Sequence, residues 1–417
     1  MAAGRRVTCV IAADDLTGAA DACATFVERG LSGVVRLRAS PCAPAADVVA
    51  ISTESRGLSS AEAAGRVRRV SERWSSDCEG AVGFKKIDST LRGHIGEELA
   101  AVMEAWRATR AIVAPAFPRM GRTLEGGLLR VAGGDAQETD APQGHLPTLL
   151  ATQGLRDCRL VLRPSNEPSL DGWASAMASA LRSGRRVIVC DSLHDEDLDA
   201  IVHAVWGIPE RVLWVGSAGL AGALARRLTD LPRRSSAPTL SARPVGGAGT
   251  REGSVVFWIG STQAVTVRQC ERVLSDDGSR LVALAAADVD ALERHLHAGR
   301  HVLLDAGPTV ADDALAPCVR VAASHRIAGF VMSGGDTAAR VCRALGADAI
   351  QIGGEVSGGI PWGWLQASAE TTAVHDAEPL GQPARRWPVV LKAGGFGGPD
   401  AFVQALMFLT ATAGDQI

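Results

Sequence analysis

The stretch Val7-Thr8-Cys9-Val10-Ile11-Ala12-Ala13-Asp14-Asp15-Leu16-Thr17-Gly18 contains the pattern from which we expect the fold to be built. It begins with a mostly apolar run, passes through small and polar residues, and leads into an alanine-rich segment. The same order recurs along the chain, with apolar runs at residues 111–114, 187–190, 212–215, 255–259, 330–332 and 389–392. Continuous apolar strands separated by helices predict buried parallel sheets with helices on both faces.

The length of 417 residues exceeds what one ordinary core accommodates and predicts two domains. Residues 231–253 are rich in Pro, Gly, Ser and Arg, a composition that cannot continue a helix or a central strand. We therefore predict an N-terminal domain over residues 1–230, a linker over 231–253 and a C-terminal domain over 254–417. The predicted fold class is α/β, with a mostly parallel sheet and helices on both of its faces in each domain.

The charge balance limits the kinds of partner. The 43 Lys and Arg residues nearly balance 46 Asp and Glu residues, for a net charge of -3. A nucleic-acid or membrane partner is not expected, because no basic field is present to attract it. The nine cysteines show no C-x-x-C pair, and no apolar run approaches the length of a membrane span. We expect a cytoplasmic protein, and a homo-oligomer is left open.

Lysine is rare in this chain, with three residues against forty arginines. All three belong to strand-to-loop motifs: Lys85 and Lys86 precede Ile87-Asp88-Ser89-Thr90, and Lys392 precedes a glycine-rich loop. Arginine and lysine serve almost equally on a solvated surface, so these positions favour a requirement for a compact ammonium group. Phosphate and carboxylate sites have that requirement.

The first candidate site follows the apolar run at residues 7–13. Asp14 and Asp15 stand at the end of the predicted strand, and Thr17 and Gly18 begin the predicted helix. Adjacent carboxylates there can orient a polyol or serve as a base, while the free amides face an anion. The alternative is that Asp15 or Thr17 only caps the helix.

The second candidate site combines Lys86, Asp88, Ser89 and Arg92. If the segment runs from a strand directly into a helix, Arg92 lies in the first helical turn and reaches back to the strand end. Cations can then clamp a carboxylate while Asp and Ser bind hydroxyl groups. An internal Lys–Asp ion pair is the alternative interpretation.

Two further segments belong to the predicted N-terminal domain. Pro115 and Pro118 stiffen the turn that presents Arg122 and Thr123, although the turn has a purely structural explanation as well. Residues 126–145 are glycine-rich and polar, and we predict a long loop there.

Glycine loops follow the predicted strands of the C-terminal domain. Their backbone N–H groups can surround phosphates, with Lys392 supplying charge and Asp336 binding Mg²⁺ or its waters. The loop residues are Gly260, Ser261, Thr262, Ser333, Gly334, Gly335, Asp336, Thr337, Gly394, Gly395, Phe396, Gly397 and Gly398. Neither G-x-x-x-x-G-K-[ST] nor G-x-G-x-x-G occurs, which argues against a P-loop enzyme and a typical nicotinamide-binding half.

Together these motifs resemble the four-carbon acid sugar kinases, a family once grouped only as a domain of unknown function. The matching blocks are Ala13–Gly18, Lys86–Gly93, Pro115–Pro118, Gly121–Thr123, Gly216–Gly219, Ser333–Thr337 and Lys392–Gly397, in a consistent order over nearly the whole chain. Relatives often have Gly-Ser-Cys-Ser where this chain has Gly260-Ser261-Thr262-Gln263, which puts a nucleotide contact from position 263 in doubt.

The resemblance implies ATP-dependent phosphorylation of the terminal hydroxyl of a tetronate such as erythronate, threonate or 3-oxo-tetronate. It implies that the N-terminal domain holds the sugar acid, that the C-terminal domain holds ATP, and that the active site lies in the interdomain cleft. By motif, the residues implied to face the substrate are Asp14, Asp15, Arg56, Lys86, Asp88, Ser89, Arg92 and Arg122, of which Asp14, Asp15, Lys86 and Arg92 are the catalytic candidates.

The residues implied to face ATP are Ser261, Ser333, Gly334, Gly335, Asp336, Thr337, Lys392, Gly394, Gly395 and Gly397, with Asp336 near Mg²⁺. Two other functions stay open: a sugar-acid dehydrogenase, and a sensor that binds a sugar acid without chemistry. NADH turnover would identify the first. Tetronate binding without ATP consumption would identify the second.

Overall fold

The computed structural model describes residues 7–37, 46–132, 144–164, 169–230, 253–276, 280–284, 288–367 and 386–411. Its contacts divide the chain into two units, the first comprising Met1–Gly33 and Ala39–Thr239 and the second Val34–Arg38 and Leu240–Ile417. Except for Gly253, the predicted linker lies outside the described residues. The two units are described separately below.

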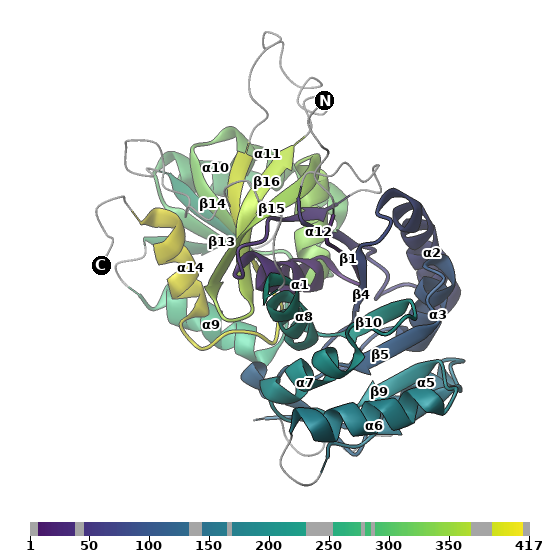
Figure 1. Ribbon diagram of the computed structural model, residues 1–417. Coiled ribbons are helices and arrows are strands. Elements are labelled where there is room, and N and C mark those ends of the chain that lie inside the picture. The colour runs from purple at the N-terminus through teal and green to yellow at the C-terminus, as the bar shows by residue number, and fades with distance from the viewer. Residues whose placement is uncertain are drawn as a thin grey trace. The chain divides into compact units, whose positions relative to one another are not determined.

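Parallel strands form the main sheet of the first unit, in the order β3-β1-β4-β10-β5-β9-β8 (Figure 1). Each strand is short, apolar and largely buried, as expected where helices cover both faces. The strands are β1 (Cys9–Ala13), β3 (Val48–Ser52), β4 (Val82–Lys86), β5 (Arg110–Ala114), β8 (Cys158–Val161), β9 (Val187–Cys190) and β10 (Val212–Gly216).

Helices cover this sheet in two layers. Helices α1, α8, α7 and α6 pack in that order, whereas α3 packs against both α2 and α5. Their bounds are α1 (Leu16–Val27), α2 (Ser60–Asp77), α3 (Ile95–Ala105), α5 (Leu146–Thr152), α6 (Leu170–Arg182), α7 (Asp195–Val205) and α8 (Ala218–Asp230). Asp15 is the N-cap of α1, because its Oδ1 accepts the N–H of Gly18 at 2.7 Å.

The sheet of the second unit is mixed. Its order is β12-β13-β11-β14-β17-β16-β15-β2, and β16 runs antiparallel to both neighbours while β12 to β17 in this order are parallel. The strands are β2 (Gly33–Arg36), β11 (Ser254–Ile259), β12 (Leu281–Leu284), β13 (His301–Asp305), β14 (Ile327–Ser333), β15 (Ala347–Ser357), β16 (Ile360–Ala367) and β17 (Arg386–Lys392).

The core of the second unit is formed by this sheet and its helices. Phe257 of β11 meets Phe402 edge to face, with ring centroids 5.7 Å apart, and Val331 and Val390 lie in the same cluster. Such aromatic pairs add to the stabilisation that burial provides. The helices are α9 (Ala264–Leu274), α10 (Val289–His297), α11 (Asp312–Ser324), α12 (Gly335–Ala344) and α14 (Ala401–Thr410).

Every strand predicted from an apolar run is present, which confirms the α/β class. Two local predictions are wrong. Residues 126–131 do not belong to a long loop, because Gly126 and Gly127 form the turn between β6 (Arg122–Glu125) and β7 (Leu128–Val131). Residues 133–143 of the predicted loop lie outside the described part of the chain. Arg92 is not in the first turn of a helix, because α3 begins only at Ile95.

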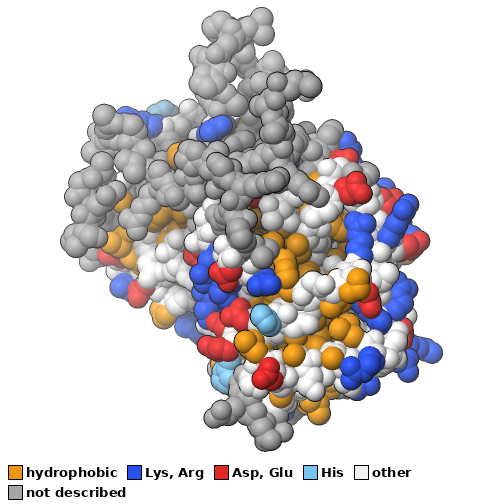
Figure 2. Space-filling view, in the orientation of Figure 1, with side chains coloured by type: hydrophobic (Ala, Val, Ile, Leu, Met, Phe, Trp, Pro, Cys, Tyr) orange, Lys and Arg blue, Asp and Glu red, His pale blue; other side chains and the backbone are white. Residues whose placement is uncertain are grey.

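Within the described part of the chain, every helix is too short or too polar to cross a bilayer. On the face drawn in Figure 2, side chains of Lys and Arg alternate with those of Asp and Glu. This mixed surface agrees with the small net charge of -3. An anionic ligand must therefore be attracted by a local arrangement of groups, not by a long-range field.

Candidate active site

Three neighbouring strands of the first unit bring the predicted substrate residues together. Strand β1 lies between β3 and β4, and Ala13, its last residue, is level with Ser52 of β3 and Lys86 of β4. The segments that follow these strands therefore leave the sheet side by side, at the carboxyl edge where open α/β sheets bind ligands. They carry Asp14 and Asp15, Arg56, and the run from Ile87 to Arg92.

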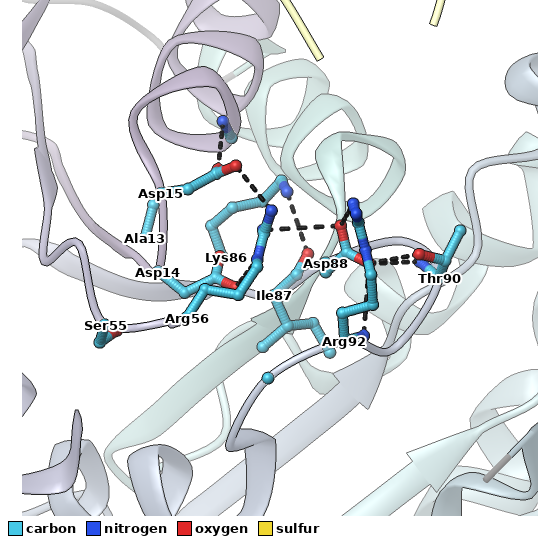
Figure 3. A network of polar contacts seen from close by, with 12 residues as sticks. Ala13, Asp14, Asp15, Ser55, Arg56, Lys86, Ile87, Asp88, Thr90 and Arg92 are labelled. Atoms are coloured by element: carbon cyan, nitrogen blue, oxygen red, sulfur yellow. Dashed lines mark hydrogen bonds and ion pairs between the residues drawn. The ribbon is translucent and has the colours of Figure 1, made fainter. Parts of the chain in front are cut away.

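Arg56 is the centre of a charged network in these segments. Its Nε lies 2.7 Å from Asp14 Oδ2, its Nη1 lies 2.6 Å from Asp15 Oδ2, and its Nη2 lies 3.5 Å from Asp88 Oδ1. Figure 3 shows the guanidinium among the three carboxylates. All three aspartates are buried, so this planar cation offsets much of the cost of removing their charges from water.

Asp88 is bound a second time by Arg92, whose Nε and Nη2 lie 2.9 and 2.8 Å from its two oxygens. Burial opposes ionisation of Asp88, but the hydrogen bonds from Arg92 and the charge of Arg56 hold its pKa far below the usual range. In Asp14, burial is likewise outweighed by Arg56 and the nearby lysines, and its pKa is lowered. The two carboxylates are therefore ionised at neutral pH.

The two oxygens of Asp14 differ in their surroundings. Oδ2 accepts from Arg56, whereas Oδ1 is buried without a hydrogen-bond partner. In Asp15, by contrast, Oδ1 accepts from the Gly18 N–H and Oδ2 from Arg56 and the hydroxyl of Thr17. The capping interpretation thus holds for Asp15, while Asp14 keeps an oxygen with unused acceptor capacity.

Lys85 and Lys86 point in opposite directions, as successive residues of a strand must. The ammonium of Lys86 is buried over the first turn of α1, where a Cβ on Gly18 would lie only 3.1 Å from Nζ. The ammonium of Lys85 is fully buried and pairs with Glu98 of α3 at 2.7 Å. The alternative interpretation of this segment was an internal Lys–Asp ion pair. The structure has a buried lysine ion pair here, but it joins Lys85 to a glutamate.

The remaining predicted substrate residues lie nearby. Ser89 and Arg122 are buried, and Arg122 stands at the start of β6. Burial lowers the pKa of Arg122, although Asp88 and Asp21 act in the opposite direction. Arg122 is thus electrostatically coupled to Asp88, which belongs to the network around Arg56.

Asp21 was not predicted as a site residue, although it lies only three residues after Gly18 of the first candidate site. It is buried on α1, and its Oδ1 has no hydrogen-bond partner. Burial raises its pKa to about 7, with the charges of Lys86 and Arg122 opposing that rise and Asp15 adding to it. A carboxyl group that shares its surroundings with three predicted site residues is a candidate for the same site.

The glycine loops of the second unit also leave neighbouring strands. Ile259 of β11 is level with Ser333 of β14, which in turn is level with Lys392 of β17. The loops are joined by backbone bonds, from Gly260 N to Ser333 O and from Gly334 N to Lys392 O, both at 2.9 Å. The structure thus brings the predicted nucleotide residues of the three loops to one edge of the sheet.

The close approach of these loops requires glycine at two positions. A Cβ on Gly260 would lie 1.7 Å from the hydroxyl of Thr337, and one on Gly394 would lie 2.2 Å from that of Ser261. Ser333 is fully buried and its hydroxyl has no hydrogen-bond partner. Phosphate groups are often bound by closely packed backbone at the start of a helix. The start of α12, with the unsatisfied hydroxyl of Ser333 beside it, has these features.

Asp336 and Lys392 lie differently in this site. Asp336 is exposed in the first turn of α12, so its carboxylate is accessible to a hydrated cation. Lys392 is 1% exposed, and its ammonium donates to the carbonyl of Gly394 at 2.8 Å and that of Ala393 at 3.2 Å. Burial lowers the pKa of Lys392 to about 7. The ammonium of Lys392 therefore faces carbonyl groups of its own loop, and this geometry does not favour a direct contact with phosphate.

A separate hollow of about 680 Å³ lies in the first unit near the amino ends of β5 and β10. Two of its arginines are engaged by the protein: Arg110 contacts Glu210, and the guanidinium of Arg211 lies over the ring of Trp106. Because the predicted residues all lie at the opposite, carboxyl edge of the sheet, this hollow is not the candidate site.

Two family models match the chain, one in each half. Residues 9–224 match the family model of a sugar-binding N-terminal domain, and residues 256–402 match that of a nucleotide-binding C-terminal domain. A D-threonate kinase of Bordetella bronchiseptica is 33% identical over 95% of this chain and 96% of its own. A 3-oxo-tetronate kinase of Methylobacterium radiotolerans is 29% identical over 94% and 97%, respectively.

The fold has also been seen in a solved structure. A crystal structure of a Haemophilus influenzae protein superimposes with a TM-score of 0.67, covering 95% of this chain and 98% of the other. At 22% identity, that likeness concerns the fold alone.

Proposed function

Because this chain belongs to the four-carbon acid sugar kinase family, we propose that it transfers the terminal phosphoryl group of ATP to the 4-hydroxyl of a tetronate. The substrate candidates are threonate, erythronate and 3-oxo-tetronate. D-Threonate and 3-oxo-tetronate are named for the relatives at 33% and 29% identity. The observation that carries the proposal is the convergence of Arg56, Asp14, Asp15 and Asp88 at the ends of β1, β3 and β4.

This network offers what a hydroxylated carboxylate requires. Arg92 binds Asp88 through Nε and Nη2, and its side chain is 53% exposed, so the remaining guanidinium nitrogen can meet the substrate carboxylate. Lys86 and Arg122 add positive charge, and the aspartates accept hydrogen bonds from hydroxyl groups. A sugar acid presents both kinds of group within a few ångströms.

Asp14 is the better candidate for the residue that receives the reacting hydroxyl. Its Oδ1 has no partner within the protein, whereas both oxygens of Asp15 are used for the helix cap, Thr17 and Arg56. Phosphoryl transfer depends chiefly on alignment and charge neutralisation, so a strong base is not needed. The low pKa of Asp14 therefore suits a group that orients the hydroxyl and accepts its proton as the new bond forms.

The glycine loops around Gly260, Gly334 and Gly394 would hold ATP, and Asp336 would hold Mg²⁺ or its bound waters. The metal supplies neutralisation of phosphate charge when bound. Transfer requires the reacting hydroxyl and the terminal phosphate of ATP to be aligned with each other. The cytoplasmic location also belongs to this proposal.

The test is a coupled assay of ATP consumption with erythronate, threonate and their 2-oxo and 3-oxo relatives. We expect one tetronate to stimulate ATP consumption well above the rate without substrate and to yield a 4-phosphorylated product by phosphorus NMR. Reduction of NAD⁺ would favour the dehydrogenase instead. Tetronate binding without any ATP consumption would contradict the kinase and favour the sensor.

Within that assay, Asp14→Asn and Asp15→Asn separate the roles of the two aspartates. We expect Asp14→Asn to lower kcat by about 100-fold or more, as loss of a proton acceptor does. Asp15→Asn keeps much of the helix cap and should affect KM more than kcat. Unchanged kcat in Asp14→Asn would rule out the proposed role of Asp14.

A further inference from the structure

The glycine loop after β17 rests on polar side chains of α9. Thr266 and Gln269, one helical turn apart, are both fully buried, although α9 is otherwise amphipathic. A buried polar side chain is costly unless it forms hydrogen bonds. The partners of these two residues therefore indicate why the helix retains them.

Both side chains bind carbonyl groups of the loop. Nε2 of Gln269 lies 3.1, 3.1 and 2.8 Å from the carbonyl oxygens of Phe396, Gly397 and Gly398, respectively. The hydroxyl of Thr266 lies 2.9 Å from the carbonyl oxygen of Gly394.

Lys392 completes this arrangement from the strand. Its Nζ lies 2.8 Å from the same Gly394 carbonyl oxygen and 3.1 Å from the Thr266 hydroxyl. Its ammonium also stands 5.5 Å from the centre of the Phe402 ring, and the residue is buried. The ammonium of Lys392 thus forms its hydrogen bonds with Thr266 and with carbonyl groups of the loop.

Binding the carbonyls from behind determines where the N–H groups point. In a trans peptide the C=O and the following N–H point in opposite directions, and no described peptide bond is cis. When the carbonyls of Gly394, Phe396 and Gly397 face α9 and Lys392, the N–H groups of Gly395, Gly397 and Gly398 face away. Gly397, with φ of +84°, lies in the left-handed region that lets successive N–H groups form a concave anion site.

We propose that Thr266, Gln269 and Lys392 act as positioning residues that hold the 394–398 loop with its N–H groups turned toward the phosphates of the nucleotide. The inference rests on the proposed kinase function and adds to it. None of the three side chains touches phosphate. They bind the rear of the loop, and the loop binds the anion.

Thr266 provides the test, because two substitutions separate its hydroxyl from its shape. Thr266→Val keeps the volume and removes the hydroxyl, and Thr266→Ser keeps the hydroxyl. We expect Thr266→Val to weaken the binding of both ATP and inorganic tripolyphosphate by about ten-fold, the loss of roughly one buried hydrogen bond. Thr266→Ser should bind both within about two-fold of the wild type, and the KM for the tetronate should not change in either variant.

A merely structural role predicts something else. A destabilised unit lowers the active fraction, and therefore kcat, without changing the dissociation constant for tripolyphosphate. If Thr266→Val binds tripolyphosphate as tightly as the wild type, the inference is wrong. If Thr266→Val does not fold, Gln269→Met takes its place with the same expectation and the same contradicting outcome.

The wild-type protein separates this inference from the proposed function. Failure of the wild type to bind ATP or to phosphorylate any tetronate would refute the kinase proposal itself. Normal wild-type activity, together with unaltered tripolyphosphate binding in the variants, would refute only the role of the three positioning residues.

Discussion

The two candidate sites offer different groups to an anion. In the first unit, side-chain charges crowd together: Arg56 contacts three buried aspartates, and a second buried ion pair, Lys85–Glu98, lies in the same unit. In the second unit the proposed anion site consists of backbone N–H groups of the loops, and Lys392 faces the interior. Recognition of a small hydroxylated acid requires side chains that bind each of its polar groups, whereas a phosphate chain can be bound by a concave arrangement of backbone N–H groups.

The largest expected effect concerns the buried charges of the first unit. In the wild type, the charged groups of Lys85 and Glu98 lie 2.7 Å apart in the interior. Lys85→Met leaves the buried carboxylate of Glu98 without this partner. We expect a loss of about 3–5 kcal/mol in the free energy of unfolding, measured by urea denaturation.

Two controls sharpen this prediction. The double variant Lys85→Met/Glu98→Leu replaces the ion pair with apolar groups and should recover most of the loss. Arg68→Met breaks an exposed ion pair, Arg68–Glu104, and should cost at most about 1 kcal/mol. Equal effects of Lys85→Met and Arg68→Met would contradict the distinction between buried and exposed pairs.

The next effect concerns geometry within the network. Arg56→Lys keeps the positive charge but cannot bind Asp14 and Asp15 simultaneously with a planar fork. Losing two hydrogen bonds of this kind should reduce kcat/KM for the tetronate by about 30- to 100-fold. The KM for ATP serves as the control and should stay within a factor of about two. An unaltered kcat/KM for the tetronate would mean that charge alone suffices in the first site.

Asp21 gives a pH-dependent effect. Its pKa of about 7 lies above the ordinary 3.8, so the folded protein favours the neutral carboxyl. The cost of ionising Asp21 is absent below about pH 4, grows between pH 4 and 7, and is fully present above pH 7.

Asp21→Asn removes this cost. The difference in unfolding free energy between the variant and the wild type should increase by about 2 kcal/mol, in favour of the variant, as the pH rises from about 5 to about 8. Denaturation curves at several pH values measure the difference. A difference between the two proteins that does not vary with pH would show that Asp21 titrates normally.

The smallest effect tests the backbone site. The Cβ of Gly394→Ala would meet the hydroxyl of Ser261 at 2.2 Å, so that side chain must move. We expect the KM for ATP to rise about ten-fold, equivalent to roughly 1.4 kcal/mol, with the KM for the tetronate unchanged. Gly358→Ala, where nothing lies within 4 Å of the added Cβ, is the control and should leave the KM for ATP unchanged. An unchanged KM for ATP in Gly394→Ala would contradict the proposed backbone site.

Most of the first site was predictable because its residues follow apolar strands. Asp14 follows the apolar run at residues 7–13, and Lys86 and Asp88 belong to a strand-to-loop motif, whereas Arg56 was predicted only from the family resemblance. Parallel strands deliver residues at their carboxyl ends to one edge of a sheet. Asp21 was missed because a single Asp inside an alanine-rich helix also suits a solvated face. Its burial depends on how neighbouring elements pack, which the sequence does not specify.

Other features left a weaker signal. Strands β15 and β16 were missed because three register shifts and the pair Gly353-Gly354 interrupt the alternation of buried and exposed residues. Lys392 was predicted to supply charge to a phosphate beside the loop, because the sequence identifies the loop but not the direction of the side chain. Thr266 and Gln269 share a helical stripe with buried Val273, and that spacing could have identified them as buried.

The most direct test measures binding of both ligands to the same three proteins: the wild type, Arg56→Lys and Gly394→Ala. Isothermal titration calorimetry with the tetronate that the assay identifies, and separately with ATP, gives six dissociation constants. The account predicts that Arg56→Lys weakens only tetronate binding and that Gly394→Ala weakens only ATP binding. If each variant weakens both ligands to the same extent, or if Arg56→Lys weakens only ATP, the assignment of one anion to each unit is wrong.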